Sequence, residues 1–334
     1  QRLAFLQSEY ALTPSDRMLT NTSYTFDVSV AEIFWPLLAG ASLVIAEEEE
    51  SRDPRALRQL ISTHGVSCTC IVPSALTGLL TTGGLANSVE QEPLAGVNEE
   101  PSAGLNEEPS AGLGTEPSAG LGKANLSVTD ALASLRLVLV AGEALPQTLA
   151  HDFHTLCDGR MVNLYGPTEG TIYASATDID PITSDITIGK AIAATQLYII
   201  NSATQLQPFG TEGELAIGGD ALAEGYLGRE ELNLERFQPN PFATGRIYKT
   251  GDRARMCPDG VVEYLGRADA QVKLRGFRIE LGEIEHLLRE HAAVSDAAVL
   301  VDDGGSRKQL LAYYEGAPVP GSELRGFLES HVPS

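Results

Sequence analysis

The stretch NLYGPTEGT, residues 163–171, is the most informative part of the sequence. It places an aromatic ring, a Gly-Pro turn, a hydroxyl and a carboxylate in the five positions from Tyr165 to Glu169. The Gly-Pro pair fixes the local backbone, so that the neighbouring side chains leave it in set directions. Such a loop can hold a flat base on Tyr165, a phosphate at Thr168 and a divalent metal at Glu169. Taken alone, the stretch is also compatible with an ordinary strand-to-helix loop.

The composition is that of a globular protein with a strong acidic balance. The chain has 334 residues, of which 43% are hydrophobic and 6% aromatic, and this length predicts two or more domains. The formal net charge is −22, from 45 acidic and 23 basic residues. A chain this acidic lacks a general attraction to phosphate backbones or anionic membranes. We therefore expect no nucleic-acid and no membrane partner, and a nucleotide site that a metal cation helps to neutralise.

The cysteines indicate a reducing compartment. Of the four, only Cys68 and Cys70 are close in sequence, inside an apolar run. On a strand we expect these two thiols to point to opposite faces, so that neither a disulfide nor a shared metal forms. Reduced thiols are typical of cytosolic proteins, and no apolar run reaches membrane-spanning length. We expect a cytoplasmic location.

Apolar strands and amphipathic helices alternate along the first part of the chain. Residues 34–40 have the pattern of a helix that ends at a glycine, and residues 54–64 carry apolar side chains on one helical face. Residues 43–46, 70–72 and 137–140 are short apolar runs typical of buried strands. This alternation predicts an α/β fold of layered sheets and helices, with much parallel pairing.

The pattern changes twice further along the chain. A β-rich portion has predicted strands at residues 196–200, 214–217 and 260–266. Beyond Arg267, the apolar spacing at residues 282–289 predicts a helix within a short α+β unit. We predict a large subdomain over residues 1–268 and a small α+β subdomain over residues 269–334.

A repeat interrupts the large subdomain. Residues 92–123 are four tandem octapeptides, EPLAGVNE, EPSAGLNE, EPSAGLGT and EPSAGLGK. They are rich in Pro, Gly, Ser and Glu and have few large apolar groups. Such a segment cannot bury enough surface to offset the entropy of ordering. We interpret residues 84–128 as a disordered insert that arose by duplication in a tolerant surface loop; a docking tail is the alternative.

Polar and charged residues that could bind a ligand also lie at other turns of the sequence. Asp27 lies in an otherwise apolar stretch, where a carboxylate needs a helix terminus, an internal cation or the ammonium group of a ligand. Ala141-Gly142-Glu143 follows a predicted strand, at the end where α/β sheets place ligands. Asp252 can accept hydrogen bonds from a ribose or simply close a turn. The basic stretch 266–280 is either a solvated face or a phosphate-facing edge.

Six ordered motifs together resemble the amino-acid-activating adenylation domain of nonribosomal peptide synthetases, within the adenylate-forming superfamily of acyl-CoA ligases and luciferases. The resemblance covers the chain except the repeat, and it implies a large layered subdomain followed by a small α+β one. The motifs are FDVSVAEIFWPLLAG (26–40), LVLVAGEAL (137–145), NLYGPTEGTIYA (163–174), GELAIGGDALAEGYL (213–227), YKTGDRARMCPDG (248–260) and GRADAQVKLRGFRIELGEIE (266–285).

The resemblance implies roles for individual side chains around ATP and Mg²⁺. Thr168, Glu169 and Arg267 are the implied catalytic residues, with Thr168 at the α-phosphate and Glu169 on Mg²⁺. The implied nucleotide contacts are Gly142, Glu143 and Ala144 along the adenine, Asn163 at its exocyclic amine, Tyr165 stacked on it, Asp252 at the ribose, and Tyr264, with Arg267, beside the nucleotide.

The resemblance also implies an amino-acid pocket in which Asp27 pairs with the substrate ammonium group. The implied lining residues are Asp27, Val28, Ala31, Cys70, Leu139, Ala141, Leu164, Ile172 and Tyr173. Apart from Asp27 none is charged, so a charged substrate side chain is disfavoured. The large Tyr173 fills much of the pocket. This favours a small or medium apolar amino acid, with glycine or alanine ahead of leucine or valine, and Cys70 leaves room for a serine-like or cysteine-like one.

The implied reaction has two steps. The amino-acid carboxylate attacks the α-phosphate of ATP, which gives an aminoacyl adenylate and pyrophosphate, and the acyl group then passes to the phosphopantetheine thiol of a carrier protein. Charge neutralisation and alignment dominate the first step. The implied partners are the carrier-protein and condensation domains of a larger synthetase. Asp269 is at the implied hinge about which the small subdomain rotates between steps.

The chain departs from the family pattern at both ends. A Gly/Ser/Thr/Lys-rich phosphate loop is expected before Gln1, and a late catalytic lysine beyond Ser334. We expect an internal fragment with little or no adenylation activity of its own. Two other functions stay open at this point: an acyl- or aryl-CoA ligase, which would have no use for Asp27, and a non-catalytic remnant disrupted by the repeat.

Overall fold

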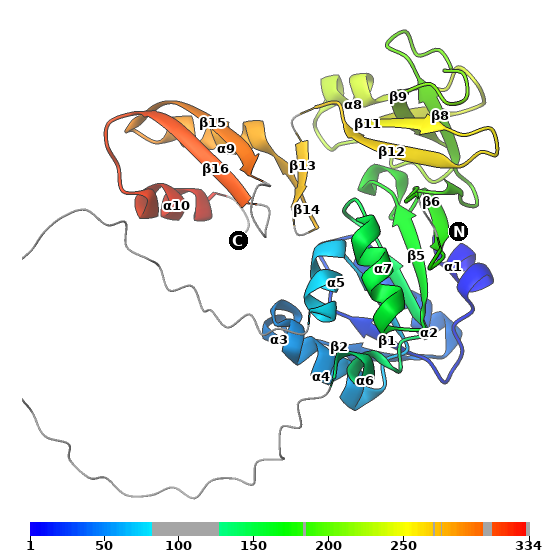
Figure 1. Ribbon diagram of the computed structural model, residues 1–334. Coiled ribbons are helices and arrows are strands. Elements are labelled where there is room, and N and C mark those ends of the chain that lie inside the picture. The colour runs from blue at the N-terminus through cyan, green and yellow to red at the C-terminus, as the bar shows by residue number, and fades with distance from the viewer. Residues whose placement is uncertain (82–126, 183–184, 270, 275, 303–308, 332–334) are drawn as a thin grey trace, which may run out of the picture.

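The computed structural model describes residues 1–81, 127–182, 185–269, 271–274, 276–302 and 309–331 (Figure 1). All but the last two residues of the predicted insert, 84–128, lie outside these ranges. The description resumes at Ser127, whose side chain accepts a hydrogen bond from the Asp130 N–H and caps the next helix.

The central element is a seven-stranded sheet in the order β2-β1-β3-β4-β5-β6-β7. The first five strands in that order pair in parallel, and β6 and β7 extend the sheet beyond β5 by antiparallel pairing. The strands are β1 Arg17–Thr20, β2 Ser42–Ile45, β3 Cys68–Ile71, β4 Leu137–Val140, β5 Arg160–Tyr165, β6 Ser175–Ile179 and β7 Lys190–Ala191. The predicted α/β class with much parallel pairing is confirmed.

Helices cover both faces of this sheet, as Figure 1 shows. They are α1 Arg2–Tyr10, α2 Val28–Ala39, α3 Glu48–Arg52, α4 Pro54–His64, α5 Pro73–Leu80, α6 Val128–Leu132 and α7 Gln147–Leu156. The α4 helix has the predicted bounds because its ends carry strong signals. Asp53 accepts a hydrogen bond from the Arg55 N–H at 2.9 Å, and Gly65 ends the helix at φ 57°.

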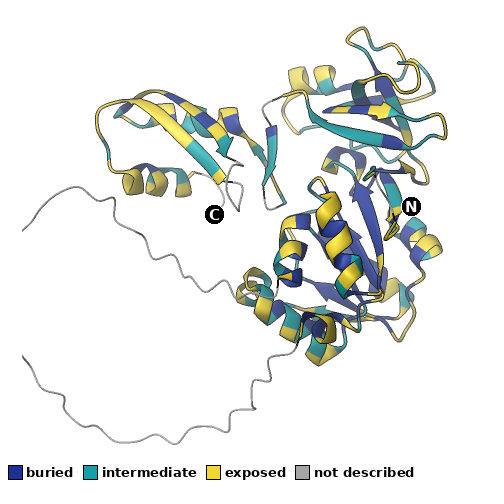
Figure 2. Ribbon diagram, viewed as in Figure 1, coloured by how far each residue is buried: buried dark blue, intermediate teal, exposed yellow. Residues whose placement is uncertain are grey.

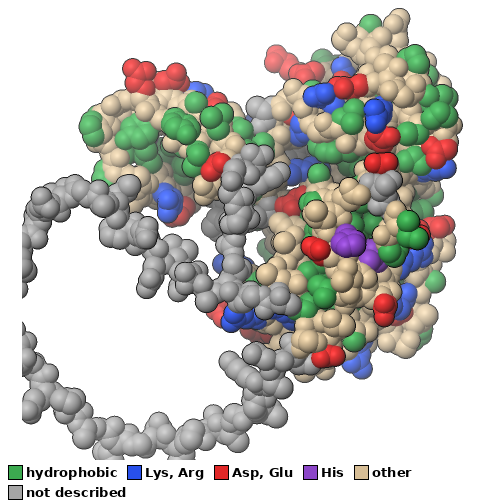
Figure 3. All heavy atoms as spheres, viewed as in Figure 1, with side chains coloured by type: hydrophobic (Ala, Val, Ile, Leu, Met, Phe, Trp, Pro, Cys, Tyr) green, Lys and Arg blue, Asp and Glu red, His purple; other side chains and the backbone are tan. Residues whose placement is uncertain are grey.

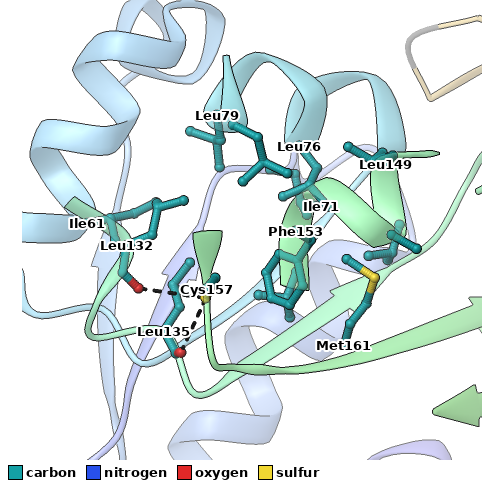
Figure 4. Close-up of a cluster of buried hydrophobic side chains, with 14 of the residues drawn as sticks. Ile61, Ile71, Leu76, Leu79, Leu132, Leu135, Leu149, Phe153, Cys157 and Met161 are labelled. Carbon is teal, nitrogen blue, oxygen red and sulfur yellow. Dashed lines mark hydrogen bonds between the residues drawn. The ribbon is translucent and has the colours of Figure 1, made fainter. Parts of the chain in front are cut away.

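Two apolar cores lie on opposite faces of the sheet. In β4, Val138 and Val140 belong to one core, which α4, α5, α6 and α7 cover, and Leu137 and Leu139 belong to the other, under α1 and α2. Figure 4 shows the first core, with Phe153, Leu76 and Met161 packed together. Both faces of the central strands are therefore covered by apolar side chains and shielded from solvent.

The prediction for Cys68 and Cys70 is wrong in its geometry. Both thiols belong to the core under α1 and α2, because residues two apart on a strand point to the same face. Both are free thiols in this structure, as are Cys157 and Cys257.

The β-rich portion forms a second sheet in the order β10-β11-β9-β8, and β12 pairs with β11. Its elements are β8 Gln196–Ile200, β9 Gly213–Gly218, α8 Glu230–Arg236, β10 Phe237–Pro239, β11 Arg246–Met256 and β12 Val262–Arg267. The pairing of β11 with β9 is irregular between Lys249 and Arg253. This irregularity re-aims the intervening residues, which include Asp252.

The last elements form a third layer with its own core. A hairpin of β13 (Gln271–Leu274) and β14 (Phe277–Glu280) leads into α9 (Leu281–Glu290), β15 (Val294–Asp302), β16 (Gln309–Gly316) and α10 (Gly321–Glu329). Leu288 and Val299 are the most buried apolar side chains of this core. The division at residues 268 and 269 falls between β12 and β13 and stays a prediction.

Burial and charge are distributed as in a globular protein. Figure 2 shows buried residues concentrated in the central sheet, and Figure 3 shows acidic and basic side chains interspersed on the viewed face. Within the described ranges, every helix is too short or too polar to cross a bilayer.

Candidate active site

The most informative stretch of the sequence begins on a strand of the central sheet. Asn163 and Tyr165 belong to β5, and the 3₁₀ turn η1 (Thr168–Gly170) follows at its carboxyl end. The turn after β4, which contains Gly142, and the turn after β3, which contains Val72, lie at the same edge of the sheet. Because the parallel strands end together there, side chains distant in sequence converge.

Tyr165 joins a buried polar group that we call the nucleotide group: Tyr165, Asp252 and Arg267. The Tyr165 hydroxyl donates to one carboxylate oxygen of Asp252, and Arg267 Nη1 donates to the other at 2.6 Å. Asp252 is 2% exposed. Burial, and then the Asp252 charge, raise the pKa of Tyr165 well above its ordinary value. The predicted ribose and base contacts are therefore neighbours.

One aromatic ring and one cation lie beside the ring of Tyr165. The rings of Tyr165 and Tyr264 have centroids 6.3 Å apart, and the ammonium group of Lys273 lies 5.6 Å from the Tyr165 centroid. A base sandwiched between two rings needs a separation of about 7 Å, twice the contact distance of carbon atoms. A base inserted between Tyr165 and Tyr264 would therefore separate them slightly. Asn163 is 4% exposed and donates from Nδ2 to the Thr187 carbonyl at 2.7 Å.

Arg267 connects this group to the predicted hinge. Its Nε and Nη2 atoms donate to the two carboxylate oxygens of Asp269, each at 2.7 Å. Asp269 precedes β13, so one guanidinium group holds Asp252 on β11 and the start of the last layer together. The role of Asp269 as a hinge stays a prediction.

The turn after β4 contacts the tip of the β13–β14 hairpin. Glu143 accepts hydrogen bonds from the Ser74 N–H at 3.0 Å and from the Gly276 N–H at 2.7 Å. A Cβ atom on Gly276, at φ +81°, would lie 2.9 Å from Val72 Cγ1, so only glycine fits there. The predicted adenine contact Gly142 lies next to this junction, and Ala144 is exposed. The sequence did not predict that the hairpin reaches Glu143.

The predicted amino-acid pocket is brought together as well. Seven of its lining residues belong to the core under α1 and α2, and Val28 packs against it. Those seven are Ala31, Cys70, Leu139, Ala141, Leu164, Ile172 and Tyr173. Cys70 Sγ lies 3.2 Å from the Tyr173 hydroxyl. Burial is the main reason that the pKa of Cys70 rises to about 12.

Asp27 lies beside this cluster with an unsatisfied oxygen. It occupies the N-cap position of α2 but makes no side-chain capping hydrogen bond. In the described part of the chain, its buried Oδ2 atom has no hydrogen-bond partner and its carboxylate has no ion pair. Its charge contributes to the raised pKa values of Cys70 and Tyr173. Neither of the purely structural explanations, a cap or an internal salt bridge, accounts for this carboxylate.

A second carboxylate, which the sequence analysis missed, lies one helical turn further on. Glu32 is fully buried and accepts hydrogen bonds from the Thr22 hydroxyl at 2.6 Å and from the Thr22 and Asn21 N–H groups. Burial raises its pKa to about 7. The sequence could have identified Glu32, because it is a carboxylate within the apolar segment that forms α2.

Glu169 is 6% exposed, and one of its carboxylate oxygens accepts a hydrogen bond from the Tyr226 hydroxyl. Its neighbour Thr168 is exposed. Among the described residues, no three His, Cys, Asp or Glu side chains gather to hold a metal by themselves. Mg²⁺ in nucleotide sites is bound by one or two carboxylates together with substrate phosphates. A single ordered carboxylate such as Glu169 fits that kind of site.

The turn after Glu169 is strained and held by a distant arginine. Thr171 and Ile172 have φ values of 61° and 67°, which are rare for β-branched residues. Arg2 on α1 donates to the carbonyls of Gly170 at 2.8 Å and Thr171 at 3.0 Å. Ile172 and Tyr173 are thereby presented to the pocket. A lone arginine in an amphipathic helix gave no signal of this contact in the sequence.

Two open cavities in the described part of the chain lie away from most of the predicted site residues. A cavity of about 370 Å³ is lined by Glu230, Asn233, Leu234, Phe237 and Arg246, and contains none of the predicted site residues. Another of about 270 Å³ contains only Tyr264 among them. The predicted pocket positions are instead packed against one another in this structure, and the converging polar side chains mark the candidate site.

Comparisons with known proteins identify the family of this chain. The AMP-binding enzyme family matches residues 2–227. The dimodular nonribosomal peptide synthase of Bacillus subtilis is 36% identical over 99% of this chain, which spans 12% of that relative. Gramicidin S synthase 2 of Aneurinibacillus migulanus is 35% identical, again over 99% of this chain, which spans 7% of it.

Two solved structures extend the comparison. A four-domain nonribosomal peptide synthetase, holo-AB3403 bound to AMP and glycine, is 31% identical with a TM-score of 0.62, over 100% of this chain and 22% of its own. The Vibrio cholerae adenylation domain AlmE, in complex with glycyl-adenosine-5'-phosphate, is 25% identical with a TM-score of 0.74, over 98% of this chain and 55% of its own. The chain belongs to the AMP-binding enzyme family and is of the adenylation-domain type found in nonribosomal peptide synthetases.

Proposed function

We propose that this chain is the part of an adenylation domain that binds ATP and an amino acid and joins them as an aminoacyl adenylate. A small or medium apolar amino acid is the proposed substrate. The acyl group then passes to the phosphopantetheine thiol of a carrier protein. The carrier-protein and condensation domains of a larger synthetase are the proposed partners, because the curated relatives are much longer synthases.

The unsatisfied Oδ2 atom of Asp27 is the observation that carries this proposal. An amino acid supplies the ammonium donor that this oxygen lacks among the described residues, and an acyl- or aryl-CoA ligase substrate does not. The Cys70–Tyr173 pair lies within reach of the Asp27 charge and limits the space beside it. This supports a short substrate side chain.

The nucleotide group is proposed to bind the other reactant. Tyr165 offers a ring for the base, and Asp252 offers acceptor positions for ribose hydroxyls. A bound Mg²⁺ at Glu169 would supply charge neutralisation at the phosphates. Thr168 and Arg267 would orient the α-phosphate and the nucleotide. The chain's own contribution is alignment of the amino-acid carboxylate with the α-phosphate.

Binding of adenylate analogues tests the proposal directly on this chain. Alanyl-sulfamoyl adenosine mimics the aminoacyl adenylate, and propionyl-sulfamoyl adenosine differs from it by lacking the amine. We expect calorimetry to show about 10- to 100-fold tighter binding of the alanyl compound, because a hydrogen bond to a charged group contributes about 1.5–3 kcal/mol. A leucyl compound should bind more weakly than the alanyl one. Equal binding of the alanyl and propionyl compounds would instead favour an acyl-CoA ligase.

A further inference from the structure

We propose that Tyr226 is a positioning residue for Glu169, holding its carboxylate in the orientation in which it binds the Mg²⁺ of ATP. This inference rests on the proposed function. The two residues are 57 positions apart in sequence, and the hydroxyl of Tyr226 donates directly to Glu169 Oε1.

The main chain around Glu169 is already fixed from two sides. The Ala223 N–H donates to the Glu169 carbonyl at 2.8 Å, and Arg2 donates to the next carbonyl, that of Gly170. The orientation of the carboxylate then depends on the side-chain torsions of Glu169. A hydrogen bond to one oxygen from a fixed donor selects among these torsions.

Tyr226 is such a fixed donor. Its N–H donates to Asn233 Oδ1 at 2.6 Å, and its carbonyl accepts from Asn233 Nδ2 at 2.8 Å. A Cβ atom on Gly225 would lie 2.7 Å from Asn233 Oδ1, so the glycine permits this close clamp. The Tyr226 ring packs edge-on against Phe237, with centroids 5.6 Å apart. Backbone and ring are therefore both held, and the hydroxyl has a defined position.

A second tyrosine supports the hydroxyl. The Tyr248 hydroxyl lies 3.2 Å from that of Tyr226, and Tyr248 is fully buried on β11. An ionised carboxylate only accepts, so the single Tyr226 hydrogen goes to Glu169. The Tyr226 oxygen can then accept the hydrogen of the Tyr248 hydroxyl. The resulting order, Tyr248 to Tyr226 to Glu169, polarises the final hydrogen bond.

The chemistry of magnesium explains why this arrangement matters. Mg²⁺ demands nearly octahedral geometry and tolerates misplaced ligands poorly. Hydrogen-bond partners behind the metal ligands typically contribute 10- to 100-fold to metal affinity. Glu169 would bind the ion, and Tyr226 would set the direction from which the carboxylate approaches it.

Calorimetric titration of this chain with ATP, in Mg²⁺ and separately in EDTA, tests the inference without any turnover. In the wild-type chain we expect Mg²⁺ to strengthen ATP binding. In Tyr226→Phe, which keeps the ring against Phe237, this Mg²⁺-dependent gain should fall by about 10- to 100-fold. The affinity in EDTA should stay at the wild-type value, whereas general damage to the fold would lower both.

Matched variants keep the test decisive. Tyr198→Phe removes a hydroxyl that donates to Gln196 at 2.9 Å, away from Glu169, and should keep the wild-type gain. Tyr248→Phe, which leaves Tyr226 in place, should lose a smaller part of the gain. A wild-type gain in both Tyr226→Phe and Tyr248→Phe would overturn the inference alone. Absence of any Mg²⁺-strengthened ATP binding in the wild-type chain would overturn the proposed function and this inference together.

Discussion

The carboxylates at the two ends of the candidate site differ in their hydrogen-bond partners among the described residues. In the nucleotide group, Asp252 is 2% exposed and bound by both Tyr165 and Arg267. In the amino-acid pocket, Asp27 keeps a buried oxygen without a partner among the described residues. A paired carboxylate holds the protein together before any ligand arrives. An unpaired buried carboxylate lowers stability until a ligand donates a hydrogen bond to it. The contrast in pairing therefore separates carboxylates that stabilise the folded site from those whose partner is the substrate.

The largest expected effect comes from removing the partner of Asp252. Arg267→Met leaves a buried carboxylate without its cation, and we expect the free energy of unfolding to fall by about 3–5 kcal/mol. Urea unfolding followed by circular dichroism measures this. The control is Arg253→Met, on the same strand as Asp252, which breaks an exposed pair with Glu212 and should leave stability nearly unchanged. Equal losses of unfolding free energy in both variants would contradict the claim that the buried pairing of Asp252 stabilises the folded protein.

A pH-dependent effect of intermediate size is expected at Glu32. Its folded-state pKa is about 7, above the ordinary value of 4.5, because of burial. The unfolded chain loses this proton first as pH rises, so the favourable contribution of the protonated carboxyl is complete below pH 4.5 and lost as pH passes 7. Relative to Glu32→Gln, the wild-type chain should lose roughly 3 kcal/mol of stability across this window.

Urea unfolding at several pH values measures this difference in stability between the wild-type chain and Glu32→Gln. Glu48→Gln, on an exposed side chain of α3, should follow the wild-type curve. Parallel curves for the wild-type chain and Glu32→Gln would contradict the prediction.

The smallest expected effect is a gain in stability. Asp27→Ala removes the unsatisfied oxygen, and we expect the free energy of unfolding to rise by about 1 kcal/mol, while the preference for alanyl- over propionyl-sulfamoyl adenosine disappears. Asp16→Ala is the opposite control, because Asp16 is bound by Arg136 at 2.7 Å and its loss should destabilise. A destabilised Asp27→Ala would show that Asp27 supports the fold rather than waits for substrate.

Local patterns predicted the fold well. The α4 helix has the predicted bounds because Asp53, Pro54 and Gly65 signal its ends within a few residues. The β4 strand was recognisable because both of its faces are apolar. The error at Cys68 and Cys70 came from applying the alternation of adjacent residues to residues two apart.

The site was predictable where its chemistry is concentrated in a motif. Tyr165, Asp252, Arg267 and Asp27 each lie in a short stretch with unusual polar content. Contacts that depend on the folded chain left no such signal. Arg2 reaches Gly170 across 168 residues, Glu143 reaches Gly276 across 133, and Tyr226 reaches Glu169 across 57. Each of these pairs is set by how the layers pack, which no local pattern reports.

The most direct test of the account is a crystal structure of this chain with alanyl-sulfamoyl adenosine. The account predicts that the ligand ammonium group donates to Asp27 Oδ2, that the alanyl methyl group contacts the Cys70–Tyr173 pair, and that the ribose lies at Asp252. A ligand whose amine points away from Asp27, with that oxygen still lacking a donor, would contradict it.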